Sequence, residues 1–207
     1  MRKVASNMLK KNFSSTFLSC AKDQELIWRK LLVDSKPYSD KLKRLLIVNT
    51  PNCLDLSQEQ YQRTINKYTV NDMIDDGYIK VIPKLTFGEH EEVKSYILLE
   101  FDDFVPTDNP QYRDCVISFS IICHLDYWDM DDYKLRPWEI AGYIDGILNN
   151  ERLSGIGTLQ FLGASQLVLS EYLGGVSLRY LATHSKADDE EHSSDNNIPS
   201  FNDVNYA

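Results

Sequence analysis

The chain has 207 residues, of which 43% are hydrophobic and 11% aromatic, enough to bury the core of one domain with extensions or of two small domains. No run approaches the eighteen or so apolar residues of a membrane span. The four cysteines show no CxxC spacing, which excludes a secreted disulfide framework and favours a reducing compartment.

Charge divides the chain into two parts. Residues 1–44 contain eleven Lys and Arg against four Asp and Glu, a balance of +7, and residues 45–207 contain eleven against twenty-seven, a balance of −16. An acidic body repels nucleic acid phosphates, so it is not expected to grip DNA. The basic part is expected to contact an acidic neighbour, for which the body of another copy qualifies.

The N-terminus has no acidic residue before Asp23, five basic residues and several serines. This composition also occurs in organellar transit peptides, but a basic amphipathic arm or first helix is the interpretation that we prefer. The segment is too polar to form the apolar centre of a secretory signal.

Helical spacing of apolar residues predicts helix from about Asp23 to Val48, interrupted at Pro37. Ser57 and Gln60 resemble a capping box that opens a short helix in a segment otherwise rich in turn formers. The stretch TVNDMIDDG predicts another helix that ends at Gly77.

Beyond Gly77 the apolar residues recur at every second position, which is typical of strands. Pro83 makes YIKVIPKLTF an edge strand at best. Residues 93–105 are expected to form a strand with one face made by Val93, Ile97, Leu99, Phe101 and Val105. Residues 115–127 alternate most clearly, with apolar or cysteine side chains at every odd position and Ser118, Ser120, His124 and Asp126 opposite.

A helix is predicted after DDYKLRP, because Pro137 suits a first helical position. Its apolar stripe consists of Ile140, Ile144, Ile147 and Leu148, and is extended by Trp138 and Ala141. Two strands follow, at 159–169 and 176–183, with a reversal supported by Gly174 and Gly175.

The expected fold class is α+β: a mainly antiparallel sheet of about four strands with helices packed on one face. The predicted organisation is a helical N-terminal region (1–77), an α+β sheet domain (78–184) and a disordered acidic tail (185–207).

The sequence contains no constellation that indicates catalysis, a cofactor or a metal, so the protein is expected not to be an enzyme. The acidic turn DYWDMDDYK does not place oxygens in the register of a calcium loop. Cys123 and His124 are adjacent in a strand and point to opposite faces. An enzyme with a dispersed site using Asp126, Asp129 or His124 is the hypothesis ranked last.

Aromatic and basic residues around the last predicted helix have the composition of protein interfaces. Ordinary packing of the helix start on the sheet explains them equally well. The interface candidates are Trp128, Tyr133, Arg136, Trp138 and Arg179.

Residues Lys94 to His184 resemble the tail terminator proteins of tailed bacteriophages. The resemblance lies in the long strand that ends in aromatic and acidic residues, the helix RPWEIAGYIDGILNN and the closing hairpin IGTLQFLGASQLVLSEYLGGVSLRYLATH. It rests on the order of the elements and on their general sequence pattern rather than on an invariant motif.

This resemblance implies a structural virion protein of the neck, assembled in the host cytoplasm. It implies a hexameric ring that caps the tail tube protein and joins it to a head-completion or connector protein. DNA would pass through the pore without specific binding, and no membrane is involved. Another head–tail joining, head-completion or baseplate component remains an alternative.

Overall fold

The structure, a computed structural model, describes residues 16–55, 57, 63, 65, 68–80, 93–109 and 111–185. The predicted basic arm, the Ser57–Gln60 capping box, most of the expected edge strand at 78–87 and the predicted acidic tail beyond residue 185 lie outside the described residues.

The N-terminal helices form as the apolar spacing predicts. Helix α1 (Thr16–Arg29) continues into a π-helical segment (Lys30–Asp34), and α2 (Tyr38–Ile47) begins directly after Pro37. Of the eight apolar side chains at this spacing, Leu26 and Val48 are half-buried and the other six are fully buried, namely Ile27, Leu31, Leu32, Leu42, Leu45 and Leu46. Proline therefore separates the two helices where the sequence indicates, because it lacks the amide hydrogen that would continue the first one.

Helix α4 (Val70–Asp75) confirms the helix expected before Gly77, which adopts a φ of +72° after the helix ends. Its N-terminus carries a capping box that was not predicted. The Thr69 side chain accepts a hydrogen bond from the Asp72 amide, and the Asp72 carboxylate accepts one from the Thr69 amide at 2.8 Å.

The capping box makes the stability of α4 dependent on pH. Hydrogen bonds from the Thr69 backbone and side chain lower the pKa of Asp72 below its ordinary value of 3.8. A carboxyl whose folded pKa is depressed contributes stability above its unfolded pKa and loses it as the pH falls through the folded value. We expect the stability difference between the wild type and Asp72→Asn to be constant near neutrality and to shrink below pH 3.8, as measured by urea unfolding at several pH values. A difference that stays constant down to pH 2 would contradict this.

The main sheet has five strands in the order β1-β2-β3-β7-β6. Their bounds are β1 (Ile79–Lys80), β2 (Ser95–Pro106), β3 (Tyr112–His124), β6 (Gln160–Val168) and β7 (Leu173–Ser185). All neighbours pair antiparallel except β1, which lies parallel to β2 at the sheet edge. The predicted α+β class is confirmed, and β1 adds a fifth strand to the expected four. A separate two-stranded sheet joins β4 (Arg152–Leu153) and β5 (Gly157–Thr158).

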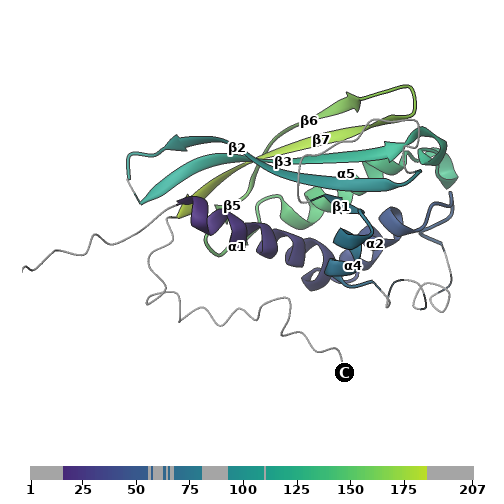
Figure 1. Cartoon of the computed structure of the whole chain (residues 1–207), viewed down its shortest axis with the longest axis horizontal. Coiled ribbons are helices and arrows are strands. Elements are labelled where there is room, and N and C mark those ends of the chain that lie inside the picture. The colour runs from purple at the N-terminus through teal and green to yellow at the C-terminus, as the bar shows by residue number, and fades with distance from the viewer. Residues whose placement is uncertain are drawn as a thin grey trace, which may run out of the picture.

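Helices α1, α2 and α5 (Arg136–Leu148) cover one face of the sheet, whereas β6 lies away from them (Figure 1). The described part of region 1–77 and the sheet contribute to one cluster of buried residues, in which Trp28 of α1 meets Phe119 of β3 edge to face. The odd-numbered residues of β3 from Cys115 to Cys123 all face this core and are fully buried, as their alternation predicts.

Helix α5 carries the predicted stripe. Ile140, Ile144 and Leu148 are fully buried, and the Tyr180 hydroxyl of β7 donates a 2.9 Å hydrogen bond to Asp145 of the helix. Trp138 was expected to extend the stripe, and this is wrong, because its side chain is 45% exposed on the outer side of the first turn.

Two strand predictions require correction. A register shift between Asp102 and Val105, with Asp103 at a φ of +51°, moves Val105 off the core face and leaves it 55% exposed. A bulge adds a residue to one strand and thereby reverses the facing of the residues after it. The strand predicted to reach Tyr127 ends at His124, after which Leu125–Tyr127 form a 3₁₀ turn and Leu125 is exposed.

Gly174 and Gly175 do not form the predicted reversal. Both lie inside β7, paired with β3 on one side and β6 on the other, and the chain reverses at residues 169–172. The reason for glycine here is space. A Cβ atom on Gly175 would lie 1.8 Å from the Ile121 carbonyl oxygen, and one on Gly174 would lie 3.0 Å from the Trp128 ring.

Candidate functional site

The structure separates the five interface candidates by exposure. Tyr133 is fully exposed, Trp138 is 45% exposed and Arg179 is exposed on β7, so all three lie on the surface. Trp128 is half-buried and Arg136 is fully buried. The surface location expected for Arg136 is therefore wrong.

Arg136 is enclosed by backbone carbonyl groups. Its guanidinium donates hydrogen bonds of 2.8–2.9 Å to four of them and a longer one of 3.6 Å to a thiol. The acceptors are the carbonyl oxygens of Tyr127, Leu45, Val48 and Thr50 and the Sγ of Cys53. Four of these five lie at the end of α2 and in the loop after it, so Arg136 attaches that loop to the start of α5.

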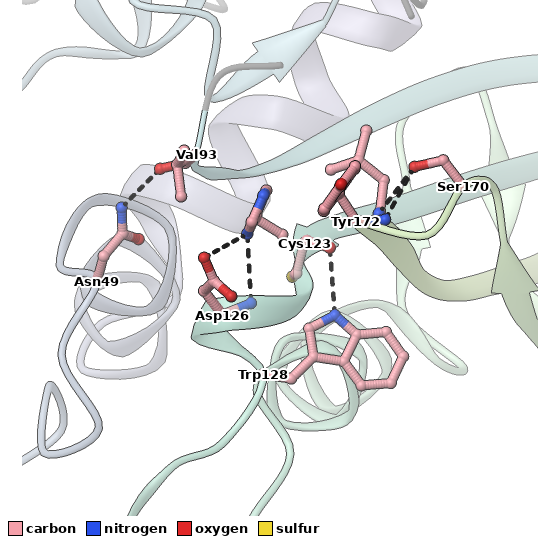
Figure 2. A network of polar contacts seen from close by, with 9 residues as sticks. Asn49, Val93, Cys123, Asp126, Trp128, Ser170 and Tyr172 are labelled. Carbon is pink, nitrogen blue, oxygen red and sulfur yellow. Dashed lines mark hydrogen bonds and ion pairs between the residues drawn. The ribbon is translucent and has the colours of Figure 1, made fainter. Parts of the chain in front are cut away.

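Trp128 also has a structural role. Its indole nitrogen donates a 3.2 Å hydrogen bond to the Cys123 carbonyl (Figure 2). Its ring lies against Gly174. The half-buried ring thus packs against the sheet just after the end of β3. These contacts agree with the alternative stated in the sequence analysis, that Trp128 packs the helix start on the sheet.

His124 and Asp126, which the enzyme hypothesis would use, do lie together. The Nδ1 atom of His124 accepts a 3.3 Å hydrogen bond from the Asp126 amide and lies 3.4 Å from its carboxylate, while the imidazole stacks on Tyr172 at 6.2 Å between ring centroids. Figure 2 shows Asp126 at the start of the turn that follows β3. His124 thus caps this 3₁₀ turn. Asp129 is exposed in the next turn, where its backbone pairs with Leu135.

A groove lies between α2 and α5 on the outer side of the helices. It has a volume of about 380 Å³ and an open, largely aromatic wall. The rings of Tyr38 and Tyr143 lie 6.5 Å apart, and the Lys41 ammonium lies 5.9 Å from the centre of the Tyr143 ring. The lining residues are Tyr38, Trp138, Glu139, Gly142, Tyr143 and Gly146.

Strand β6 forms the outer edge of the main sheet and has the sequence QFLGASQLV, without a charged residue or a proline. Seven of its nine residues are exposed, and the apolar side chains of Phe161, Leu162 and Val168 are 45%, 48% and 80% exposed. A register shift lies between Phe161 and Gly163, and from Gly163 to Val168 the strand pairs regularly with β7. Edge strands of soluble proteins usually carry charges or prolines that prevent further pairing, and β6 carries neither.

A buried polar cluster joins α1 to β7 and was not predicted. The Nδ1 atom of His184 lies 2.6 Å from the Asp23 carboxylate, and the two side chains are 0% and 3% exposed. Cys20 lies beside them, so that one ligand atom from each of the three residues falls within 4.8 Å of the others. Burial, and secondarily the Asp23 carboxylate, raises the pKa of Cys20 to about 11.

The sequence did contain a signal for this cluster. His184 continues the period-two series of core-facing residues in β7, and Cys20 and Asp23 are three residues apart, hence on one face of a helix. Across the part of the chain that the structure describes, this is the one group of three Cys, His, Asp or Glu side chains that converges as metal ligands do.

Comparison with known families identifies the chain. A family model described as YomW matches residues 39–182, so the chain belongs to the YomW family. The family name is phage-derived, which indicates a phage protein. None of the curated proteins matches the chain. Within the described ranges, no helix is long and apolar enough to cross a membrane.

Proposed function

We propose that this chain is a structural, non-enzymatic virion protein resembling a tail terminator, whose copies associate into a ring at the neck of a tailed phage. In this role it caps the tail tube and joins it to the head-side connector, with DNA passing through the pore unbound. The family name and the element order of residues 94–184 support a phage assembly role. The exposed, uncharged β6 edge is the observation that carries the proposal.

An open strand edge presents backbone donors and acceptors to any extended segment that reaches it. A ring of identical subunits uses two different surfaces of each copy, one meeting the other across every interface. We assign β6 to one of these surfaces, and we propose that a neighbouring copy of the chain binds to it. The +7 balance of residues 1–44 and the −16 balance of the rest favour such a head-to-tail arrangement, because each copy offers both signs.

The groove between α2 and α5 supports a second contact in the same ring. Tyrosine and tryptophan are enriched at the centres of protein interfaces, and Tyr38 and Trp138 are 55% and 45% exposed here. A further copy or the tail tube protein would cover them.

The test is the oligomeric state of the full chain, alone and with purified tail tubes, by mass photometry and negative-stain microscopy. The double variant Ala164→Lys/Gln166→Lys adds two charges to exposed positions of β6, and we expect it to weaken ring formation by about tenfold or more, because like charges at an edge oppose pairing. The control Asn149→Lys/Ser154→Lys adds the same charge at exposed positions outside the edge and should assemble normally.

A wild-type protein that stays monomeric and never binds tail tubes would remove the proposal. If the β6 variant and the control variant assembled equally well, β6 would not be part of the interface. Rings found in particles at a site other than the end of the tail tube would favour the head-completion or baseplate alternative.

A further inference from the structure

We propose that Cys20, Asp23 and His184 form a binding site for one Zn²⁺ ion that ties the first helix to the last strand. This inference is independent of the ring proposal, since it concerns a buried site within one copy. It rests on the convergence of three ligand types, on charge balance and on the state of the His184 ring.

The geometry fits a small ion after minor adjustment. Zinc lies about 2.0–2.3 Å from nitrogen, oxygen and sulfur ligands, so neighbouring ligand atoms in a tetrahedral site are roughly 3.2–3.6 Å apart. The three ligand atoms here are already within 4.8 Å of one another, and the contact between Nδ1 and the Asp23 oxygen, now 2.6 Å, would lengthen as the ion replaces the proton between them. We expect rotation of the Cys20 and Asp23 side chains to bring the ligand atoms to these distances.

The charge of the site also matches. A thiolate and a carboxylate carry two negative charges, which a divalent cation neutralises, and a neutral imidazole adds none. Buried charges are tolerated when they are paired or bound to a metal, and Asp23 and His184 are both buried. Sulfur and imidazole ligands select zinc over calcium or magnesium, which take oxygen ligands.

The orientation of the His184 ring agrees with this geometry. It is fully buried and its Nδ1 faces Asp23, while its Nε2 has no hydrogen-bond partner among the residues that the structure describes. The rings of Phe101 and Phe104 flank the imidazole at 5.5 and 6.0 Å between centroids, so its surroundings are apolar. Nδ1 is therefore the ring nitrogen that would bind the ion, and ligation would hold the ring in the orientation that it already has among these apolar side chains.

The experiment is a titration of the full-length, metal-free protein with Zn²⁺ against a competing chelator, and with Co²⁺ followed by absorption. Cys20→Ser removes the thiolate at a half-buried position, and Cys53→Ser is the matched control at a thiol on the far side of the core, where a hydroxyl can still accept from Arg136. Far-ultraviolet circular dichroism of the metal-free proteins verifies that all three fold.

We expect the wild type and Cys53→Ser to bind one equivalent of metal, to show a thiolate-to-cobalt charge-transfer band and to melt at a higher temperature when Zn²⁺ is present. Cys20→Ser should lose the band, the thermal shift and at least about tenfold in affinity. The inference is overturned if the wild type binds no stoichiometric metal, or if Cys20→Ser binds as the wild type does.

Discussion

Replacing Arg136 by Met is expected to destabilise the protein by about 3–5 kcal/mol. The substitution keeps much of the side-chain volume but removes every donor from four buried or half-buried carbonyl groups, those of Tyr127, Leu45, Val48 and Thr50. Arg136→Lys is expected to recover little of the loss, because an ammonium is a point donor and cannot reach acceptors arranged around a planar fork. Equilibrium unfolding in urea measures both.

The matched control for this prediction is Arg179→Met. Arg179 is exposed on β7, so its replacement should change the free energy of unfolding by no more than about 0.5 kcal/mol. Equal effects at the two positions would show that the carbonyl cage around Arg136 does not stabilise the loop after α2.

Gly175→Ala is expected to lower the free energy of unfolding by at least about 4 kcal/mol or to prevent folding, since it combines overpacking with loss of sheet pairing. The new Cβ would meet the Ile121 carbonyl oxygen at 1.8 Å and the carbonyl carbon at 2.8 Å, and both belong to the backbone of the adjacent central strand. Backbone cannot rotate away as a side chain does, so β3 and β7 would have to separate. Urea unfolding and the yield of soluble protein measure the effect.

Gly163→Ala serves as the comparison within the same sheet. A Cβ at Gly163 on β6 would have no neighbour within 4 Å, so this change should be neutral or stabilise the protein by up to about 1 kcal/mol, because alanine loses less backbone freedom on folding. If both alanine variants lowered the free energy of unfolding by similar amounts, glycine would be required in these strands for a reason other than space.

Much of the fold follows from local periodicity. The alternation in β3 and the stripe in α5 each predict one buried face, since side-chain direction depends only on backbone geometry within the element. Pro37 and Pro137 similarly mark a helix break and a helix start through their own missing amide hydrogens. The predicted α+β class follows from the order of such elements.

The errors share a different cause. The bulge that exposes Val105 depends on how β2 pairs with β3, and the close approach at Gly175 depends on the neighbouring strand. Neither is visible within the segment itself. The same holds for the burial of Arg136, whose charge and position at a helix start are equally typical of a surface residue.

The sequence by itself determined where the chain is helical or extended, which face of most elements is apolar, and how charge is divided between the first 44 residues and the rest. Tertiary structure alone decided that Arg136 lies among carbonyl groups, three of which belong to residues about ninety positions earlier in the chain. It also decided that Cys20 and Asp23 meet His184, and that β6 has no neighbour on its outer side among the described strands. The physical reason is that periodicity acts within a single element, whereas hydrogen-bond partners, metal ligands and free edges depend on which distant elements are brought together.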